Sequence, residues 1–250
     1  MALARPVVLG NWKMNGLRAD GLALAGALAD KAAKLSGTLG VFPPATLLGA
    51  VARRREGSGI LVGGQDCHER ASGAHTGSIS AAMLKDAGAQ AVILGHSERR
   101  HGLGETDALV AAKALAALDA GLRIVVCVGE TEQEWLDGRT LERLDTQLRG
   151  SIPAGVDADR LIVAYEPVWA SGTGRTPGVD EIEAAHRHLR DRLAGLVTDG
   201  QTVPLLYGGS VKSGNASDIL AQRSVDGALV GGASLDAREF WAIYQAGGGA

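Results

Sequence analysis

Short apolar runs rich in valine, isoleucine and leucine recur along the whole chain. They do not alternate between polar and apolar residues, as a strand with one solvent-exposed face does. Continuous runs of this length are typical of strands buried on both faces, and such strands belong to parallel sheets. The eight runs lie at residues 7–10, 39–42, 60–64, 91–95, 123–129, 161–166, 204–209 and 227–232.

Segments rich in alanine and leucine, with the periodicity of amphipathic helices, lie between the runs. Thr106 or Asp107 can serve as an N-cap, and Asp180 precedes a first turn rich in glutamate. Gly121 and Gly195 are suitable helix exits. The three clearest helical segments are residues 21–33, 106–121 and 180–195, and these signals mark the ends of the second and third.

The order of runs and helices predicts an α/β fold, a single (β/α)8 barrel. Eight strand-and-helix units in 250 residues leave about 31 residues for each unit, close to the minimum for this barrel, so residues 1–250 are expected to form one domain. The alternative is a doubly wound open sheet with a glycine-rich dinucleotide fingerprint. The segment GTGRTPG at 172–178 has the wrong glycine spacing for that fingerprint and follows a run ending in Glu166.

Residues that can carry chemistry follow the apolar runs. Active sites of (β/α)8 barrels form at the carboxyl ends of the strands, where residues from distant parts of the chain meet. We therefore expect the candidates to line one mouth of the barrel. In chain order they are Asn11, Lys13, His96, Glu98, Glu166, Gly208, Gly209, Ser210, Gly231 and Gly232.

Glu166 and His96 are candidates for acid-base chemistry. A carboxyl at a strand end that a loop seals from water loses solvation, which raises its pKa and suits a base that removes a proton from carbon. The alternative is a glutamate that caps a helix or forms an ion pair. His96 stands where a helix could begin, and a neutral imidazole there can donate a hydrogen bond to a carbonyl oxygen. A lone histidine is more often a structural hydrogen-bonding residue.

Lys13, Asn11 and the glycine pairs are candidates for binding anions. An ammonium and an amide can stabilise an oxyanion, although a lysine after a turn is often merely exposed. The glycine pairs, with Ser210, leave backbone N–H groups open to a phosphate, and a helix amino terminus expected after Gly232 would add to the attraction. A single glycine pair usually marks only a tight turn.

Composition and charge exclude several kinds of partner. The net charge is −3 and aromatic residues make up 4% of the chain, so no basic, aromatic-rich surface for nucleic acid is expected. No apolar run approaches the ~18 residues of a membrane span, and no secretory signal is recognisable, which favours a cytoplasmic protein with no membrane partner. Cys67 and Cys127 lack a CxxC partner and fit reduced thiols in the core.

Other enzyme classes fit the motifs less well. A Schiff-base aldolase needs a lysine within a strand, and only Lys13 lies near a strand end. A serine hydrolase needs GxSxG, and GHSER at 95–99 lacks the second glycine. His186 and His188 are two residues apart and face different sides of a helix, which disfavours a zinc site. A non-catalytic phosphosugar-binding protein needs the glycines but not the candidate catalytic side chains.

Five motifs together resemble a known family. They are GNWKMN at 10–15, GHSERR at 95–100, AYEPVWASGTG at 164–174 with one change from the family pattern, YGGSV at 207–211 and LVGGASL at 229–235. In this combination, and in register over nearly the whole chain, the sequence resembles the triosephosphate isomerase family. The resemblance implies a TIM barrel that interconverts dihydroxyacetone phosphate and D-glyceraldehyde 3-phosphate through an enediolate, in glycolysis and gluconeogenesis, with no metal and no cofactor.

The resemblance also implies roles for the candidates. Glu166 would shuttle the proton, His96 would polarise the carbonyl, and Lys13 with Asn11 would steady the developing charge. Glu98 would be a supporting carboxylate. The residues implied to hold the phosphate are Asn11, Lys13, Gly172, Ser210, Gly231 and Gly232.

A lid over the bound phosphate is implied as well. It would exclude water and keep the enediolate from losing its phosphate. Trp169 would anchor one hinge of this lid, unless it only packs in the core. The lid residues are Pro167, Val168, Trp169, Ala170, Ser171, Gly172, Thr173, Gly174, Arg175 and Thr176.

Two residues of the lid region depart from the family pattern. Ser171 replaces an isoleucine, so the apolar cover of Glu166 would depend mostly on Leu229, and we expect a less desolvated, less basic carboxylate. Pro177 replaces an alanine whose N–H can bond Tyr207 when the lid closes. Proline has no N–H, and the lost bond would cost the closed state ~1 kcal/mol.

The segment at 65–80 resembles a long loop that inserts into a neighbouring subunit. Thr76 would reach the partner's Lys13 region, and Ser78 replaces a glutamate, which removes one intersubunit ion pair. A loop of this length is unlikely to stand alone in water, so we predict a homodimer. A sister isomerase acting on a four-carbon ketose phosphate is the nearest alternative, and the GTG of the lid weighs against it.

Overall fold

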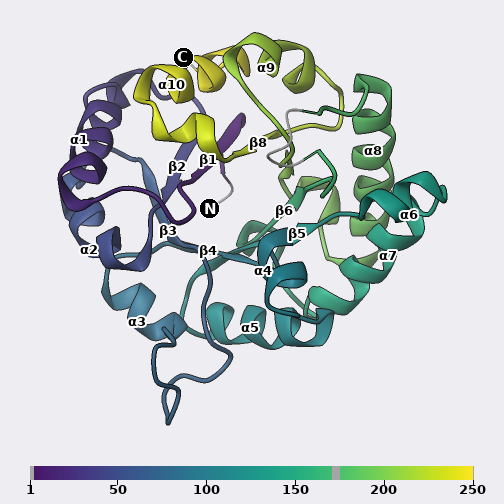
Figure 1. The fold of residues 1–250 in the computed structure, drawn as a ribbon, viewed down its shortest axis with the longest axis horizontal. Coiled ribbons are helices and arrows are strands. Elements are labelled where there is room, and N and C mark those ends of the chain that lie inside the picture. The colour runs from purple at the N-terminus through teal and green to yellow at the C-terminus, as the bar shows by residue number, and fades with distance from the viewer. Residues whose placement is uncertain (1–2, 171–174, 250) are drawn as a thin grey trace.

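Eight parallel strands form a closed barrel in the computed structural model, which describes residues 3–170 and 175–249 (Figure 1). Each strand pairs with its neighbour in chain order, and β1 pairs with β8 to close the barrel. The predicted (β/α)8 barrel is confirmed. The strands are β1 Val7–Asn11, β2 Thr38–Phe42, β3 Leu61–Gly64, β4 Ala91–Leu94, β5 Arg123–Val128, β6 Leu161–Tyr165, β7 Leu205–Tyr207 and β8 Gly227–Val230.

The strands are continuously apolar because both of their faces are buried. In β1, the side chains of Val7 and Leu9 belong to a cluster that fills the barrel, whereas Val8 belongs to the cluster between the sheet and the outer helices. Successive residues of a strand point to opposite faces, so a strand with apolar neighbours on both sides has no position for a polar residue. This explains why all eight apolar runs contain a strand.

Helices form a ring around the barrel (Figure 1). Thr106 is the N-cap of α5, and its hydroxyl accepts a hydrogen bond from the N–H of Leu109. The α-helices are α1 Arg18–Ala29, α2 Ala45–Arg54, α3 Ala81–Asp86, α4 Ser97–Gly102, α5 Asp107–Asp119, α6 Glu132–Leu136, α7 Thr140–Ser151, α8 Val179–Leu196, α9 Ser213–Leu220 and α10 Ala237–Ala246; the 3₁₀ helices are η1 Ala32–Lys34, η2 Ala158–Arg160, η3 Gly200–Thr202 and η4 Gly232–Leu235.

Some predicted helix ends differ from the observed ones. Gly121, with φ of 79°, follows the end of α5 as predicted. Gly195 lies inside α8, so its prediction as a helix exit is wrong. The N-cap of α8 is Gly178, and Asp180 lies in the first turn. A glycine can end a helix but does not have to, because packing of the apolar face of α8 continues one residue beyond it.

The two cysteines are free and buried, as predicted. Burial raises the pKa of the Cys67 thiol to about 12, which keeps this thiol protonated and unreactive. No helix in the described part of the chain is both long and apolar enough to cross a membrane. The segment between β3 and α3 projects from the ring of helices (Figure 1), and residues 70–78 of this loop are exposed.

Candidate active site

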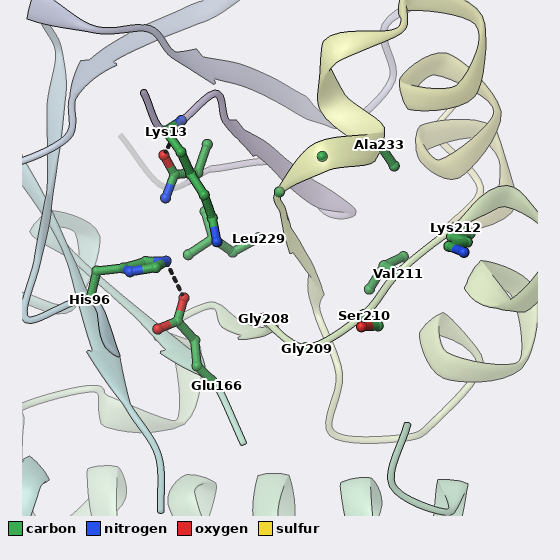
Figure 2. A pocket seen from close by; sticks show the side chains of 13 residues that line it. Lys13, His96, Glu166, Gly208, Gly209, Ser210, Val211, Lys212, Leu229 and Ala233 are labelled. Carbon is green, nitrogen blue, oxygen red and sulfur yellow. Dashed lines mark hydrogen bonds and ion pairs between the residues drawn. The ribbon is translucent and has the colours of Figure 1, made fainter. Parts of the chain in front are cut away.

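A cavity of about 380 Å³ opens at the carboxyl ends of the strands. In Figure 2, Lys13, His96 and Glu166 point into it from one side, and the Gly208–Lys212 segment lies opposite them. Among the predicted site residues that the structure describes, Glu98, Thr76 and the lid residues at 167–170 and 175–176 do not line this cavity. The lining residues are Asn11, Lys13, His96, Glu166, Gly208, Gly209, Ser210, Val211, Lys212, Leu229, Gly231, Gly232 and Ala233.

Lys13 is held in an unusual backbone conformation. Its φ of 51° lies in the left-handed region, which residues other than glycine seldom adopt. The side-chain oxygen of Asn11 accepts a hydrogen bond from the Lys13 N–H at 3.0 Å. The side chain of Gln65 donates to the carbonyl oxygens of Lys13 and Phe42, both at 2.8 Å. Gln65 was missed in the sequence, although it directly follows β3, at the same end of the barrel as the other candidates.

Glu98 pairs with Lys13 instead of facing the cavity. The Nζ of Lys13 lies 2.6 Å from Oε1 of Glu98, whose side chain is 60% exposed. Because solvent screens an exposed pair, its main effect is to set the direction of the lysine side chain. The lysine reaches the cavity from β1, and Glu98 supports it from α4.

His96 is the N-cap residue of α4 and is buried. Its Nδ1 accepts a hydrogen bond from the N–H of Glu98 at 3.2 Å. A ring nitrogen that accepts carries no proton, so the neutral ring carries its proton on Nε2. Nε2 lies 3.1 Å from Oε1 of Glu166 and faces the cavity. His96 therefore lies at the start of a helix, as the sequence analysis predicted.

Glu166 directly follows β6 and is buried. Its Oε2 accepts a hydrogen bond from the N–H of Ser97 at 3.1 Å. Two glycines leave room for it: a Cβ at Gly129 would lie 1.8 Å from the Glu166 carbonyl oxygen, and one at Gly208 would lie 2.6 Å from its Cγ. Ser97 was missed because its contribution is a backbone N–H, which no side-chain motif reveals.

The pKa of Glu166 is lowered, so the prediction that it would be raised is wrong. Burial raises the pKa of this carboxyl, as expected, but His96, the Ser97 N–H and Lys13 together lower it by more. Burial lowers the pKa of His96, and the Glu166 carboxylate raises it by more. The carboxylate is therefore ionised, and its charge is what favours a proton on the imidazole.

The opposite wall of the cavity consists largely of glycine and exposed backbone. Gly231 and Gly232 lie at the end of β8, where η4 begins at Gly232. This helix is a short 3₁₀ turn, so only a small helix dipole points at the cavity. The hydroxyl of Ser210 donates to the carbonyl oxygen of Ala170 at 2.8 Å. Ser210 thus connects this wall to the predicted lid.

The flanks of the predicted lid are described, but its centre is not. Ser171, Gly172, Thr173 and Gly174 lie outside the described residues, so the predictions for Ser171 and Gly172 remain predictions. Trp169 is buried, and its Nε1 donates to Oε1 of Glu130 at 2.8 Å. Glu130 was also missed in the sequence.

Tyr207, at the end of β7, and Pro177, which follows the predicted lid in the sequence, are both buried. The Tyr207 hydroxyl has no hydrogen-bond partner among the described residues. This fits the expectation that Pro177 offers no N–H to the hydroxyl.

No cluster of three or more histidine, cysteine, aspartate or glutamate residues that could hold a metal ion occurs within residues 3–170 and 175–249. The Nδ1 of His186 lies 3.2 Å from the Ser224 carbonyl oxygen, and the Nε2 of His188 lies 2.8 Å from Oδ1 of Asp145. The two histidines therefore have separate partners.

Comparisons with known proteins agree with the fold and the motifs. The model of the family described as triosephosphate isomerase matches residues 6–247. A triosephosphate isomerase of Jannaschia sp. (strain CCS1) is 53% identical over 245 residues, covering 98% of each chain, and one of Bradyrhizobium sp. (strain ORS 278) is 55% identical, covering 96% of this chain and 97% of that protein.

The crystal structure of triosephosphate isomerase from Bartonella henselae superposes with a TM-score of 0.90 at 42% identity, covering 97% of this chain and 98% of that one. A family match over nearly the whole chain and relatives above 50% identity lead to one conclusion. The chain is a member of the triosephosphate isomerase family.

Proposed function

We propose that this enzyme interconverts dihydroxyacetone phosphate and D-glyceraldehyde 3-phosphate by moving a proton between adjacent carbons. The observation that carries the proposal is the meeting of a buried Glu166 and of His96, whose Nδ1 accepts a backbone hydrogen bond and whose Nε2 faces the cavity, in a cavity that also receives Lys13. A base, a hydrogen-bond donor and a cation around one space are what enolisation of a carbonyl compound requires.

Glu166 is the proposed base. It would remove a proton from the carbon next to the substrate carbonyl, forming an enediolate, and return the proton to the neighbouring carbon. In the structure its Oε1 lies 3.1 Å from the Nε2 of His96. A substrate carbonyl oxygen that replaced Oε1 as the acceptor for Nε2–H would leave Glu166 with only the Ser97 N–H. Loss of one donor makes the carboxylate more basic at the moment it acts.

His96 is the proposed electrophile, with Lys13 and Asn11 in support. The charge that raises the pKa of His96 is the Glu166 carboxylate. When Glu166 takes the substrate proton, its negative charge passes to the enediolate oxygen, to which the Nε2–H of His96 would donate. The ammonium of Lys13 adds a fixed positive charge near the developing oxyanion. The side chain of Asn11 holds the backbone of Lys13 in place.

The glycine-rich wall is the proposed phosphate site. Gly231, Gly232 and Ser210 line the cavity, and a side chain at the glycines would narrow it. Backbone N–H groups bind phosphate oxygens well when no side chain is in the way. Gly172 of the lid is proposed to complete the site and, with the rest of 167–176, to exclude water.

We propose a cytoplasmic homodimer as the working form. Two features support the dimer: the loop at 70–78 projects from the barrel, and the side chain of Met14, next to Lys13, is 96% exposed. An exposed apolar residue and an unsupported loop at one end of the molecule suit a contact between copies. Thr76 is proposed to approach the partner's Lys13. A monomer by sizing with light scattering at micromolar concentration would contradict this assembly, and Met14→Glu should weaken it.

A coupled assay tests the reaction. Wild-type enzyme should convert triose phosphate much faster than a four-carbon ketose phosphate. Glu166→Asp withdraws the carboxylate by one methylene and should lower kcat by roughly 10²-fold or more while leaving the fold intact by circular dichroism. Equal activity of the variant would exclude Glu166 as the base. Preference for the four-carbon substrate would instead identify the sister isomerase.

A further inference from the structure

Trp135 in α6 contacts a flank of the predicted lid, although neither the sequence motifs nor the proposed reaction uses it. Its ring stacks on Trp169, with centroids 4.4 Å apart and an interplanar angle of 27°. An aromatic pair in this geometry adds stabilisation beyond the apolar area that it buries. The Trp169 side chain is thus fixed by Trp135 as well as by its hydrogen bond to Glu130.

The other flank of the lid is tied to the same place. The guanidinium of Arg175 lies 5.1 Å from the centroid of the Trp169 ring, within the range of a cation–π contact. Arg175 also pairs with Glu132 of α6, with 2.5 Å between Nη1 and Oε1. Trp169 precedes the four residues that the structure does not describe, and Arg175 follows them, so both sides of this gap converge on α6.

Trp135 also reaches the residues after the lid through Glu181. Its Nε1 donates to Oε1 of Glu181 at 3.2 Å, and Oε2 of the same carboxylate accepts the N–H of Gly178 at 2.8 Å. Gly178 is the N-cap of α8. One indole is therefore linked to Trp169 by stacking and to the start of α8 by a shared carboxylate.

The helix that carries Trp135, α6, is held by hydrogen bonds at its N-terminus and by a contact with α7. Thr131 and Glu134 form a capping box, in which each side chain accepts a hydrogen bond from the other's N–H. Oε1 of Glu134 also lies 3.5 Å from the guanidinium Nε of Arg143 on α7. A helix of five residues fixed at its start and tied to α7 can serve as a support for a neighbouring loop.

We propose that Trp135 is a positioning residue that clamps Trp169 against α6 and, through the Trp169 ring, also steadies Arg175 on the other flank of the lid. The inference rests on the proposed function, because it takes 167–176 to be the cover of the substrate phosphate. With the flanks already ordered, binding has fewer residues to immobilise, so the clamp improves affinity. Loss of the clamp should raise KM for the phosphorylated substrate more than it lowers kcat.

The test compares Trp135→Ala with Leu136→Ala, a matched control in the same helix whose side chain is 65% exposed. Trypsin cuts after arginine, and cleavage of the 175–176 bond requires local opening of the flank. Loss of one stacking contact should speed this cleavage, followed by mass spectrometry, by roughly three- to tenfold in Trp135→Ala and not in Leu136→Ala. KM should rise by a similar factor, and Trp135→Phe, which keeps a stacking ring, should restore most of both values.

Cleavage or KM of Trp135→Ala equal to that of Leu136→Ala would overturn the clamp. Trp135→Phe is a control for folding, since it can still be measured if Trp135→Ala unfolds. A Trp135→Phe variant with the circular dichroism of wild type, but with the cleavage rate and KM of Trp135→Ala, would show that stacking is not the cause. Proteolysis needs no turnover, so a wild-type enzyme without triosephosphate isomerase activity would refute the proposed function and leave the clamp measurable.

Discussion

Two buried carboxylates at opposite ends of the barrel have very different surroundings. Asp226 precedes β8 at the amino end of the strands, and Glu166 follows β6 at the carboxyl end. Asp226 pairs with Arg5 at 2.7 Å and with Arg190, and it also accepts the N–H of Leu205 at 2.8 Å. Glu166 has neither a guanidinium nor an ammonium partner among the described residues, and it accepts hydrogen bonds from the imidazole Nε2–H and from one backbone N–H.

The difference separates a structural carboxylate from a reactive one. Two guanidinium groups and an N–H hold both oxygens of Asp226, and the two cations offset its charge. The cation nearest to Glu166 in the cavity, Lys13, is paired with Glu98 instead. Glu166 instead binds an imidazole and a backbone N–H, and the imidazole faces the cavity, where a ligand can replace Glu166 as its acceptor. A barrel can thus place similar side chains at its two ends for stability and for chemistry.

The largest expected effect is on catalysis at the mouth of the barrel. Glu166→Gln keeps the shape of the side chain but removes the base, so kcat should fall by about 10²–10⁴-fold, the usual contribution of general base catalysis. The melting temperature should change less than in an Asp226 variant, because Glu166 lacks the guanidinium partners that Asp226 has. Steady-state kinetics and thermal melts would check both, and a variant that melts far below wild type while keeping its activity would reverse the comparison.

Asp226→Asn should show the opposite result at the base of the barrel. Removing the charge leaves the mostly buried Arg190 without its carboxylate, which should cost about 3 kcal/mol and lower the melting temperature by roughly 6–12 °C. The folded enzyme should keep a kcat close to that of wild type, because Asp226 does not line the cavity. Loss of kcat at a temperature where the variant is fully folded would argue against a purely structural role.

His186 extends the comparison to a buried group without a charged partner. Burial lowers its pKa to about 4, and its Nε2 has no hydrogen-bond partner among the described residues. Below pH 6.5 His186 binds a proton in the unfolded chain but stays neutral in the native state. The free energy of unfolding should therefore fall as the pH is lowered from 6.5 to 4, by up to roughly 3 kcal/mol. Melting temperatures across this range should fall less steeply for His186→Gln than for wild type. Equal slopes would exclude the contribution of His186.

The smallest expected effect concerns Pro177 and the unpaired hydroxyl of Tyr207. Pro177→Ala supplies an N–H, and a bond to Tyr207 in the closed state is worth about 1 kcal/mol, or roughly fivefold tighter binding of a phosphorylated inhibitor. The double variant Pro177→Ala with Tyr207→Phe should lose this gain. Binding by calorimetry is the suitable measurement, because stability would also change through the unfolded chain. A gain that survives in the double variant would point to another cause.

Much of the fold and part of the site can be predicted from the sequence. The apolar runs predict all eight strands, and the residues directly after them include Lys13 and Glu166, which do meet at one cavity. Gln65 and Ser97 could not be predicted from the sequence. The side chain of Gln65 binds backbone carbonyl oxygens, and Ser97 contributes its backbone N–H, which almost any residue type has. The prediction that α8 ends at Gly195 was wrong, because packing of the apolar face of the helix outweighs the preference of glycine for a helix end.

The sequence by itself determined the barrel and the end of the barrel where chemistry is placed, since burial of both strand faces leaves a pattern that local residues carry. Only the tertiary structure decided the lowered pKa of Glu166, the tautomer of His96 and the stacking of Trp135 on Trp169. These three depend on distances of a few ångströms between side chains from different strands and helices. Electrostatic and stacking energies change steeply over such distances, and no local pattern encodes them.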